Sequence, residues 1–456
     1  MKTALSALGR RTAPPAISWL MKTALSRPKL ISLAAGFTDN ATLPTEISRR
    51  LLNDILRSPK TGRPALQYGT TAGESHLRKL TASHLHKLDS SSFSSSSSSL
   101  KPEARMRMSM KDEDDSYSPE HVLITGGSQQ LLYMTLEALC DEGDIVLVED
   151  PTYFVFLSIL QSRNLQARGV KLERDGIDLV HLEKVLERLK KSGELRRVKA
   201  LYLVTYFQNP TGATTSLAKK RAVLKLLKKF ERAAGHPLYL IEDAAYRELS
   251  FPGRADLPVS PAEPQLRPAA PPTALTLPGA SERVIYAGTY SKPFATGVRV
   301  GFGILPEPVY TAVLRIKGNH DFGTANLLQH LLARALATRL YDRHVAKIRK
   351  NYARKAAVMR RAMAKHFPAS VEIWEAGGGL YFWARLPEGI ATGVKSKVFQ
   401  AALKADVLYV PGELCYADDP VRARPDHEMR LSFGSASDEN IREGINRLGA
   451  VLKKFV

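Results

Sequence analysis

The sequence predicts an α/β protein whose central sheet is largely parallel and covered by helices on both faces, followed by a smaller α+β region. Short, continuous apolar runs alternate with amphipathic helical segments as far as about residue 325. Such runs are typical of strands that are buried on both faces of a parallel sheet. Beyond that point a long helical stretch, residues 325–366, leads into four short strands and a last helix.

The expected elements follow in chain order. A helix over 17–26 and a brief strand over 30–35 come first. We then expect strands at 122–125, 145–149, 201–205, 238–242, 284–287 and 300–304, with helices at 128–140, 153–162 and 216–234 between them. The last third contains expected strands near 371–374, 379–386, 407–410 and 429–433, and a helix over 438–455.

These elements suggest a division into domains. An N-terminal arm, residues 1–44, is expected to join a small C-terminal domain, residues 331–456, and residues 45–330 form the large domain. Two segments resemble insertions. Residues 89–118 contain a serine run, and residues 252–281 are rich in proline and alanine. Both lack the apolar surface that offsets ordering entropy, so we expect partly disordered surface loops without catalytic roles.

Composition narrows the class of protein. The chain has 456 residues, of which 44% are hydrophobic and 24% charged, as in globular proteins long enough for two domains. No stretch approaches the ~20 continuous apolar residues of a membrane span. Cys140 and Cys415 lie in apolar surroundings without metal-ligand spacing, which predicts buried thiols in a reducing compartment and no metal site. We therefore expect a cytoplasmic protein.

The formal net charge of +21 is compatible with nucleic acid or acidic membranes as partners. The lysines and arginines, however, are spread along helical segments such as 219–232 and 343–365, without a basic cluster interleaved with aromatic residues. We interpret most of this charge as solvated helix faces and expect neither partner. The first 38 residues contain no acid, as in a transit peptide, but no apolar signal core follows Arg10-Arg11, so export is not expected.

The strongest chemical motif is Thr289-Tyr290-Ser291-Lys292, followed by Arg299. A lysine just after a strand and flanked by hydroxyls suits a Schiff-base site, because a desolvated amine loses its proton near neutrality. The hydroxyls and the arginine can bind a phosphate dianion. The alternative for this segment alone is a plain surface lysine.

Two motifs near strand ends suit the ring of an aromatic cofactor. Asp243 ends an apolar run and can pair with a protonated pyridine nitrogen, which makes the ring an electron sink. Tyr246 and Asn209 can hydrogen-bond the phenolic oxygen of the same ring, since ligands of open α/β sheets lie at the carboxyl ends of strands. A surface aspartate and a simple Asn-Pro-Thr-Gly turn are the alternatives.

Further candidates come from three other places. The turn Gly126-Gly127-Ser128-Gln129 precedes a helix, and its backbone N–H groups can bind phosphate. Tyr153 is placed to stack on an aromatic cofactor, with core packing as the alternative. Arg430 alternates with apolar residues on a strand, and its planar fork matches a carboxylate, with a surface salt bridge as the alternative.

Taken together, these motifs resemble the class I/II aminotransferases, which depend on pyridoxal 5′-phosphate, and within them the 2-aminoadipate/kynurenine and multisubstrate branch. The resemblance covers the chain from about Ile17 to its end, outside the two insertions. It implies fold type I, with a mostly parallel seven-stranded sheet in the large domain, and transfer of an amino group from an L-amino acid to a 2-oxo acid such as 2-oxoglutarate by a ping-pong mechanism.

The resemblance also assigns residues. It implies that Lys292 is the Schiff-base lysine and that Asp243 and Tyr246 are catalytic. Phosphate or ring contacts fall on Gly127, Ser128, Gln129, Tyr153, Asn209, Thr289, Ser291 and Arg299. Substrate contacts fall on Arg430, Asn209 and Gly36. Tyr68 matches a tyrosine that reaches the phosphate of a neighbouring subunit, which implies a homodimer with shared active sites.

Some features leave the reaction and the substrate open. The segment after Gly36 lacks the proline often found there, and position 289 is threonine where the family often has serine. The first departure puts the substrate in doubt, because this segment lines the pocket. Alternatives on the same scaffold are a C–S β-lyase or a decarboxylase. A transcription regulator that senses pyridoxal phosphate would carry a helix-turn-helix domain, and about 30 residues before Ile31 are too few for one.

Overall fold

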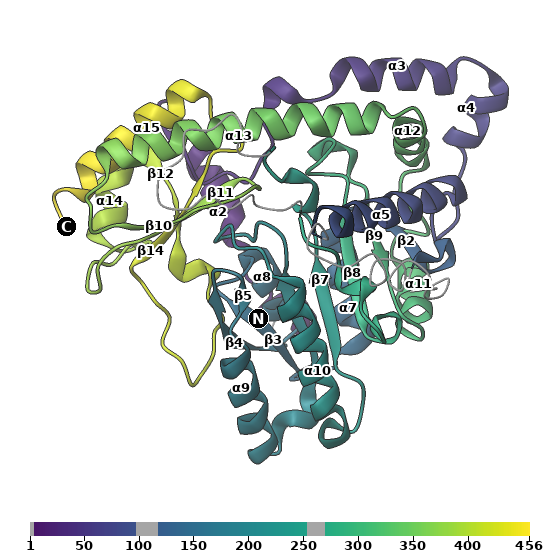
Figure 1. Cartoon of the computed structure of the whole chain (residues 1–456), viewed down its shortest axis with the longest axis horizontal. Coiled ribbons are helices and arrows are strands. Elements are labelled where there is room, and N and C mark those ends of the chain that lie inside the picture. The colour runs from purple at the N-terminus through teal and green to yellow at the C-terminus, as the bar shows by residue number, and fades with distance from the viewer. Residues whose placement is uncertain (1–3, 97–116, 253–269) are drawn as a thin grey trace.

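The computed structural model describes residues 4–96, 117–252 and 270–456. A large helix-covered sheet forms one part of the molecule, and a smaller antiparallel sheet with its own helices lies beside it (Figure 1). This is the α/β architecture with a second α+β part that the sequence predicts.

The large sheet has the strand order β2-β9-β8-β7-β6-β3-β4-β5. Its strands are β2 (Val122–Thr125), β3 (Ile145–Asp150), β4 (Gln166–Glu173), β5 (Gly176–Ile177), β6 (Val198–Val204), β7 (Tyr239–Asp243), β8 (Val284–Thr289) and β9 (Gly301–Ile304). The pairings from β8 through β7, β6 and β3 to β4 are parallel. Antiparallel pairings lie only at the two ends. The sheet is therefore mostly parallel, as predicted.

The expected number of seven strands is one too few. The eighth, β5, has two residues and folds back on β4, with Leu172 opposite Ile177. A strand this short leaves no periodic pattern in a sequence. The strand β4 itself escaped prediction because polar residues interrupt it, and its final residues are not buried.

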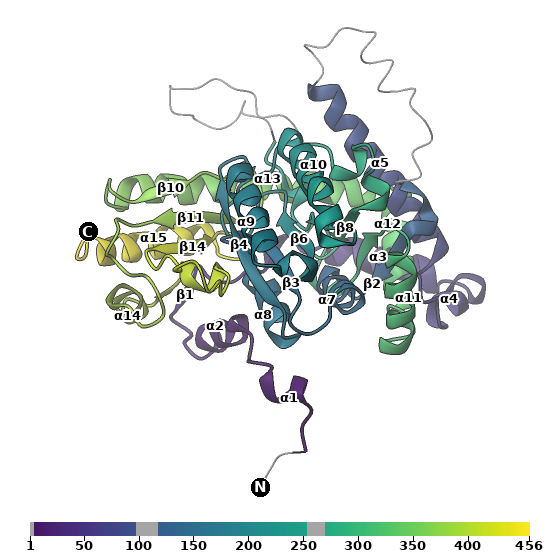
Figure 2. The ribbon, with the colours of Figure 1, turned by 90° about the horizontal axis from the view of Figure 1, so that it is seen from below.

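Helices cover both faces of the large sheet, with α5 and α10 on one face and α7 and α8 on the other (Figure 2). The helices of this part are α3 (Thr45–Leu56), α4 (Pro59–Leu66), α5 (Ser75–Ser96), α7 (Ser128–Leu139), α8 (Phe154–Ser162), α9 (Leu179–Lys191), α10 (Leu217–Ala234), α11 (Val309–His320) and α12 (Asn326–Ala337). Local signals start several of them. The side chain of Asp178 caps α9 at the His181 N–H, and Ser216 caps α10 at the Lys219 N–H.

The small sheet has the antiparallel order β10-β11-β14-β13. Its strands are β10 (Glu372–Trp374), β11 (Tyr381–Arg385), β13 (Val410–Pro411) and β14 (Glu428–Ser432), accompanied by α13 (Leu340–His366), α14 (Lys397–Lys404) and α15 (Asp438–Leu452). The N-terminal helices are α1 (Ala7–Arg11) and α2 (Ala16–Leu25). β1 (Ile31–Ser32) pairs in parallel with β12 (Val407–Leu408). This pairing supports an N-terminal arm that joins the small domain, while the boundaries at residues 44 and 330 stay predictions.

The prediction that both insertions are surface loops is wrong where the structure describes them. Residues 89–96 continue α5, and Asp89 is buried and paired with Arg247 at 2.5 Å. Asp89 also accepts hydrogen bonds from the N–H and the hydroxyl of Thr273, which belongs to the second segment. A buried acid and its partners thus order the ends of both segments. The remainder of the two insertions, 97–116 and 253–269, lies outside the described residues.

Two further expectations concern the cysteines and the membrane. Cys140 and Cys415 are free and buried, which confirms the predicted thiols. Across the described ranges, none of the helices combines the length and the hydrophobicity that crossing a bilayer requires.

Candidate active site

A cavity of about 120 Å³ lies at the carboxyl ends of β6, β7 and β8, where ligands of parallel sheets bind. Its lining contains eleven predicted residues, namely Gly127, Ser128, Gln129, Tyr153, Asn209, Asp243, Tyr246, Thr289, Ser291, Lys292 and Arg299. Leu132, Val204, Ala245 and Thr296 complete it. The structure therefore brings together motifs that are far apart in the chain.

Lys292 follows β8 and lines this cavity. Its Nζ donates a hydrogen bond of 2.8 Å to the carbonyl oxygen of Gly36. Burial lowers the pKa of the Lys292 amine, and the positive charges of Arg430 and Arg299 lower it further. A lysine that loses its proton more easily than usual is a better nucleophile and a better base. A plain surface lysine does not describe this residue.

Asp243 is the last residue of β7 and only 3% exposed. One carboxylate oxygen accepts a hydrogen bond from the Tyr202 hydroxyl at 2.8 Å, and the other accepts one from the Ala245 N–H at 3.0 Å. Burial nevertheless raises the pKa of this carboxyl to about 6. A buried acid of this kind gains most from a cationic partner, and a protonated pyridine nitrogen is one.

Asn209, Tyr246 and Arg430 form a buried chain of hydrogen bonds. Arg430 is 1% exposed and donates from Nη1 to Asn209 Oδ1 at 2.7 Å and from Nη2 to the Ala34 carbonyl at 2.6 Å. Because a guanidinium only donates, Asn209 must direct its oxygen to Arg430 and its Nδ2 to the Tyr246 hydroxyl, 3.3 Å away. Within the described residues, Arg430 Nε has no partner, so donors remain for a ligand carboxylate.

Groups that can donate hydrogen bonds to an anion lie at the amino end of α7. The backbone of Gly127 has φ of +94°, and no side chain caps the first turn, which Ser128 and Gln129 begin. Arg299 lies opposite, and its Nη1 donates to Ser291 Oγ at 3.3 Å. Free N–H groups at a helix amino terminus and a guanidinium are suited to a phosphate dianion.

The arrangement fits pyridoxal phosphate. The helix end and Arg299 can hold its phosphate, the Asp243 carboxylate can face its ring nitrogen, and the Lys292 amine can reach its aldehyde. The Nε of Arg430, without a partner among the described residues, is a donor that can serve the carboxylate of an amino acid.

Gly127 provides a test of the phosphate site. A Cβ built on Gly127 would lie 2.9 Å from Arg299 Nη2, and its φ is one that side chains rarely adopt. We expect Gly127→Ala to weaken binding of pyridoxal phosphate by about 10-fold or more, which corresponds to about 1.4 kcal/mol, because the added Cβ would displace Arg299 and the turn whose N–H groups face the phosphate. Fluorescence titration of the cofactor-free protein measures this.

The matched control is Gly193→Ala, because Gly193 has a similar positive φ of +76° but nothing within 4 Å of the added Cβ. This variant also places a side chain on a backbone with positive φ, but outside the cavity lining, so its cofactor affinity should equal that of the wild type. Equal affinity for Gly127→Ala as well would remove the α7 turn from the phosphate site.

Three predicted residues, Arg430, Gly36 and Tyr68, lie outside the cavity lining. Arg430 reaches it through its hydrogen bond to Asn209. Gly36 contacts it through its carbonyl oxygen, which holds Lys292. Tyr68 is 84% exposed and packs edge-on against Phe322, with 5.6 Å between ring centroids. Its own chain's cavity does not include it, so its role toward a neighbouring subunit stays a prediction.

Sequence reasoning missed two tyrosines. Tyr202 lies in a run of buried residues, where a partner of Asp243 looks like any core residue. Tyr381 begins β11 of the small sheet, and its hydroxyl lies 3.2 Å from the Tyr246 hydroxyl. The neighbouring glycines 377–379 were a possible signal of close backbone approach, but the approach itself depends on how the two sheets meet.

Comparisons with known proteins agree with this geometry. The family model for aminotransferases of class I and II matches residues 28–448. The 2-aminoadipate transaminase of Thermus thermophilus is 30% identical over 94% of this chain and 91% of its own length. The aromatic-amino-acid aminotransferase 1 of Thermococcus litoralis is 30% identical over 93% of this chain and 88% of its own length.

A solved structure has the same fold. It is the kynurenine aminotransferase of Pyrococcus horikoshii in complex with PMP, with a TM-score of 0.81 and 29% identity over 99% of this chain and 97% of that chain.

Proposed function

Because the chain belongs to the aminotransferases of class I and II and is thus a pyridoxal-phosphate-dependent enzyme, we propose that it moves the amino group of an L-amino acid to 2-oxoglutarate in two half-reactions. The amino donor is of the 2-aminoadipate, aromatic or branched-chain type. The observation that carries this proposal is the meeting of Lys292, Asp243 and Arg299 in one cavity beside Arg430.

Lys292 and Asp243 have different roles in the proposed reaction. When bound, pyridoxal phosphate supplies an aldehyde that links to amines and a ring that withdraws electrons. Lys292 provides the amine that anchors this group and, once displaced by the substrate, takes the proton from the substrate Cα. Asp243 keeps a proton on the ring nitrogen, because its buried carboxylate is stabilised by the facing charge.

Orientation of the substrate falls to Arg430. Its guanidinium is buried and held in place by Asn209 and the Ala34 carbonyl, so it meets a carboxylate with little reorganisation. Fixing the carboxylate also fixes the direction of the Cα–H bond relative to Lys292. Such positioning contributes several kcal/mol, roughly, to rate in oriented reactions.

Arg430→Ala is expected to raise KM for both the amino acid and the 2-oxo acid by about 10- to 100-fold, which corresponds to the roughly 1.5–3 kcal/mol of a hydrogen bond to a charged group. Steady-state kinetics with each substrate varied in turn measure it. Arg385→Ala is the control, because Arg385 lies on the neighbouring strand and pairs with Glu372 and Glu428 instead. Unchanged KM for both substrates in Arg430→Ala would place the carboxylate elsewhere.

A panel of amino donors with 2-oxoglutarate tests the reaction itself. We expect glutamate to form from at least one donor of the proposed types, with parallel lines in double-reciprocal plots as in ping-pong kinetics. Release of pyruvate and ammonia without an acceptor would instead identify a β-lyase, and release of carbon dioxide a decarboxylase. Cofactor binding without turnover would favour a sensing role.

The partners proposed here are the two substrates and a second copy of the chain, in the cytoplasm. The exposed Tyr68 supports a dimer with shared sites, since an isolated chain leaves this ring 84% exposed. Co-expression of Lys292→Ala with Tyr68→Ala subunits tests it. Mixed dimers contain one site with both native residues and should exceed either parent in activity. No gain in the mixture would contradict the shared site.

A further inference from the structure

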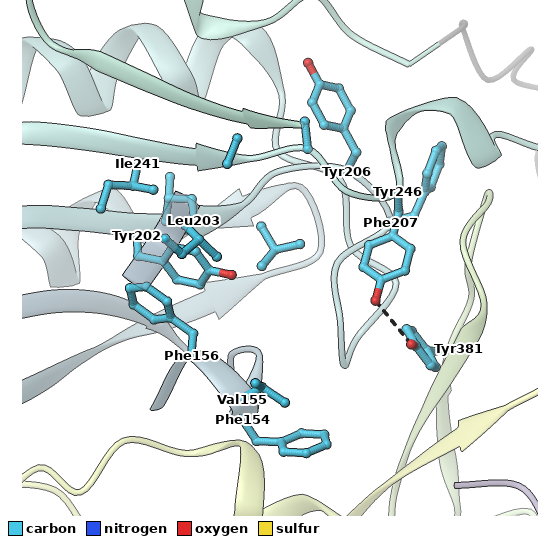
Figure 3. Packing of buried hydrophobic residues seen from close by; sticks show 14 of the residues in the cluster. Phe154, Val155, Phe156, Tyr202, Leu203, Tyr206, Phe207, Ile241, Tyr246 and Tyr381 are labelled. Carbon is cyan, nitrogen blue, oxygen red and sulfur yellow. Dashed lines mark hydrogen bonds between the residues drawn. The ribbon is translucent and has the colours of Figure 1, made fainter. Parts of the chain in front are cut away.

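Tyr381 lies where the two sheets meet and contacts three parts of the candidate active site. It is 1% exposed, begins β11, and is 3.2 Å from the Tyr246 hydroxyl (Figure 3). The guanidinium carbon of Arg430 lies 4.3 Å from the centre of its ring. A Cβ built on Gly36 would lie 2.8 Å from its hydroxyl oxygen. All three partners are expected site residues, whereas the sequence did not predict a role for Tyr381.

The hydrogen bonds around Tyr246 determine what the Tyr381 hydroxyl can do. Arg430 fixes the orientation of the Asn209 amide, which therefore donates to the Tyr246 oxygen. A phenol oxygen accepts up to two hydrogen bonds and has one proton to donate. If Tyr381 donates to the second acceptor position of Tyr246, the Tyr246 proton is free for a ligand in the cavity.

The Tyr381 ring acts on Arg430. A guanidinium over an aromatic face is attracted to it, more strongly when both are desolvated, and both side chains are only 1% exposed. The ring thus holds the guanidinium in a fixed plane, while Asn209 and the Ala34 carbonyl hold two of its nitrogens.

We propose that Tyr381 is a positioning residue with two separable parts: its hydroxyl commits the Tyr246 proton to the phenolic oxygen of the cofactor, and its ring orients Arg430 toward the substrate carboxylate. This inference rests on the proposed function. It assigns a role in transamination to a residue of the small sheet that contacts Tyr246, Arg430 and Gly36.

Tyr381→Phe tests the hydroxyl. A hydrogen bond from Tyr246 to the phenolic oxygen of the cofactor stabilises negative charge on that oxygen, which makes the proton on the Lys292 nitrogen easier to lose. Without the Tyr381 hydroxyl, Tyr246 donates this bond less well, so the Lys292 nitrogen keeps its proton to a higher pH. We expect the pH midpoint of the visible absorbance of the bound cofactor to rise by about 0.5–1 unit. The value of kcat should fall several-fold, with KM within about 2-fold of the wild type.

Tyr409→Phe is the control, since Tyr409 is also fully buried in the small part but donates to the Thr392 carbonyl. Its absorbance midpoint should match that of the wild type. A wild-type protein that binds no cofactor would end the proposed function itself. If the absorbance of the wild type changes with pH and Tyr381→Phe has the same midpoint, only the proposed role of the hydroxyl is refuted.

Tyr381→Leu tests the ring. It should raise KM for the amino acid by about 3-fold or more beyond Tyr381→Phe, because a cation–π contact contributes roughly 0.5–2 kcal/mol. Thermal unfolding and cofactor titration of both variants separate this effect from a loss of folding. Equal KM values in folded, cofactor-binding Leu and Phe variants would show that the ring does not orient Arg430.

A double substitution tests the contact between the Tyr381 hydroxyl and Gly36 without removing the ring. Gly36→Ala alone must displace the Tyr381 hydroxyl, whereas without that oxygen the nearest tyrosine atom is Cζ at 3.9 Å, an ordinary contact. Gly36→Ala should therefore raise the absorbance midpoint in the wild-type background but add little in the Tyr381→Phe background. Equal effects in both backgrounds would contradict the contact on which the proposal depends.

Discussion

Lys292→Ala is expected to lower turnover by at least about 10⁴-fold and to remove the visible absorbance of the lysine-linked cofactor. General base catalysis alone contributes about 10²–10⁴-fold, and here the same amine also anchors the cofactor. Burial lowers the pKa of Lys292, so a larger share of its amine is neutral at a given pH than for an exposed lysine. Steady-state assays and absorbance spectra of the purified variant measure both effects.

Lys292→Arg serves as the companion variant, because arginine keeps the positive charge but stays protonated and cannot act as the base. It should be as inactive as Lys292→Ala. Borohydride reduction of the wild type followed by peptide mapping should locate the cofactor on Lys292. Labelling of a different lysine, or retained turnover in either variant, would refute the assignment.

Asp243→Asn is expected to keep the cofactor but lower kcat by about 10²–10³-fold, the usual cost of removing one preorganised electrostatic partner. Asparagine occupies nearly the same space but carries no charge, so the ring nitrogen loses the acid that keeps its proton. Single-turnover measurements isolate this step from product release. Near-normal rates would mean that another acid serves the ring.

The same residue has a consequence for stability in the cofactor-free protein. Burial raises the pKa of Asp243 from 3.8 to about 6, so its ionisation costs free energy above pH 6 and nothing below pH 4. The unfolding free energy of the wild type relative to Asp243→Asn should therefore decrease by up to about 3 kcal/mol between pH 4 and 7. Denaturant unfolding at both pH values checks this. Bound cofactor should reduce the difference, because the ring nitrogen stabilises the charged form.

Much of the fold could be read from local patterns. The runs at 122–125 and 145–149 are buried strands because every residue before their polar last position is apolar, and the predicted bounds of β2 agree with the structure at both ends. The predicted helix over 216–234 agrees with α10, whose first turn Ser216 caps. The polar strand β4 was missed, and Asp89 was wrongly placed in a surface loop. The burial of both depends on partners distant in the chain.

The residue types at the candidate site were equally readable, since a lysine after a strand, an acid at a strand end and a glycine turn before a helix each have a local chemical meaning. Their convergence on one cavity follows from parallel strands, whose carboxyl ends share one edge of the sheet. Sequence by itself determined this set. Only the tertiary structure decided that Arg430 binds Asn209 and that Tyr381 contacts Tyr246, because these contacts cross between two sheets whose relative placement depends on packing over the whole chain.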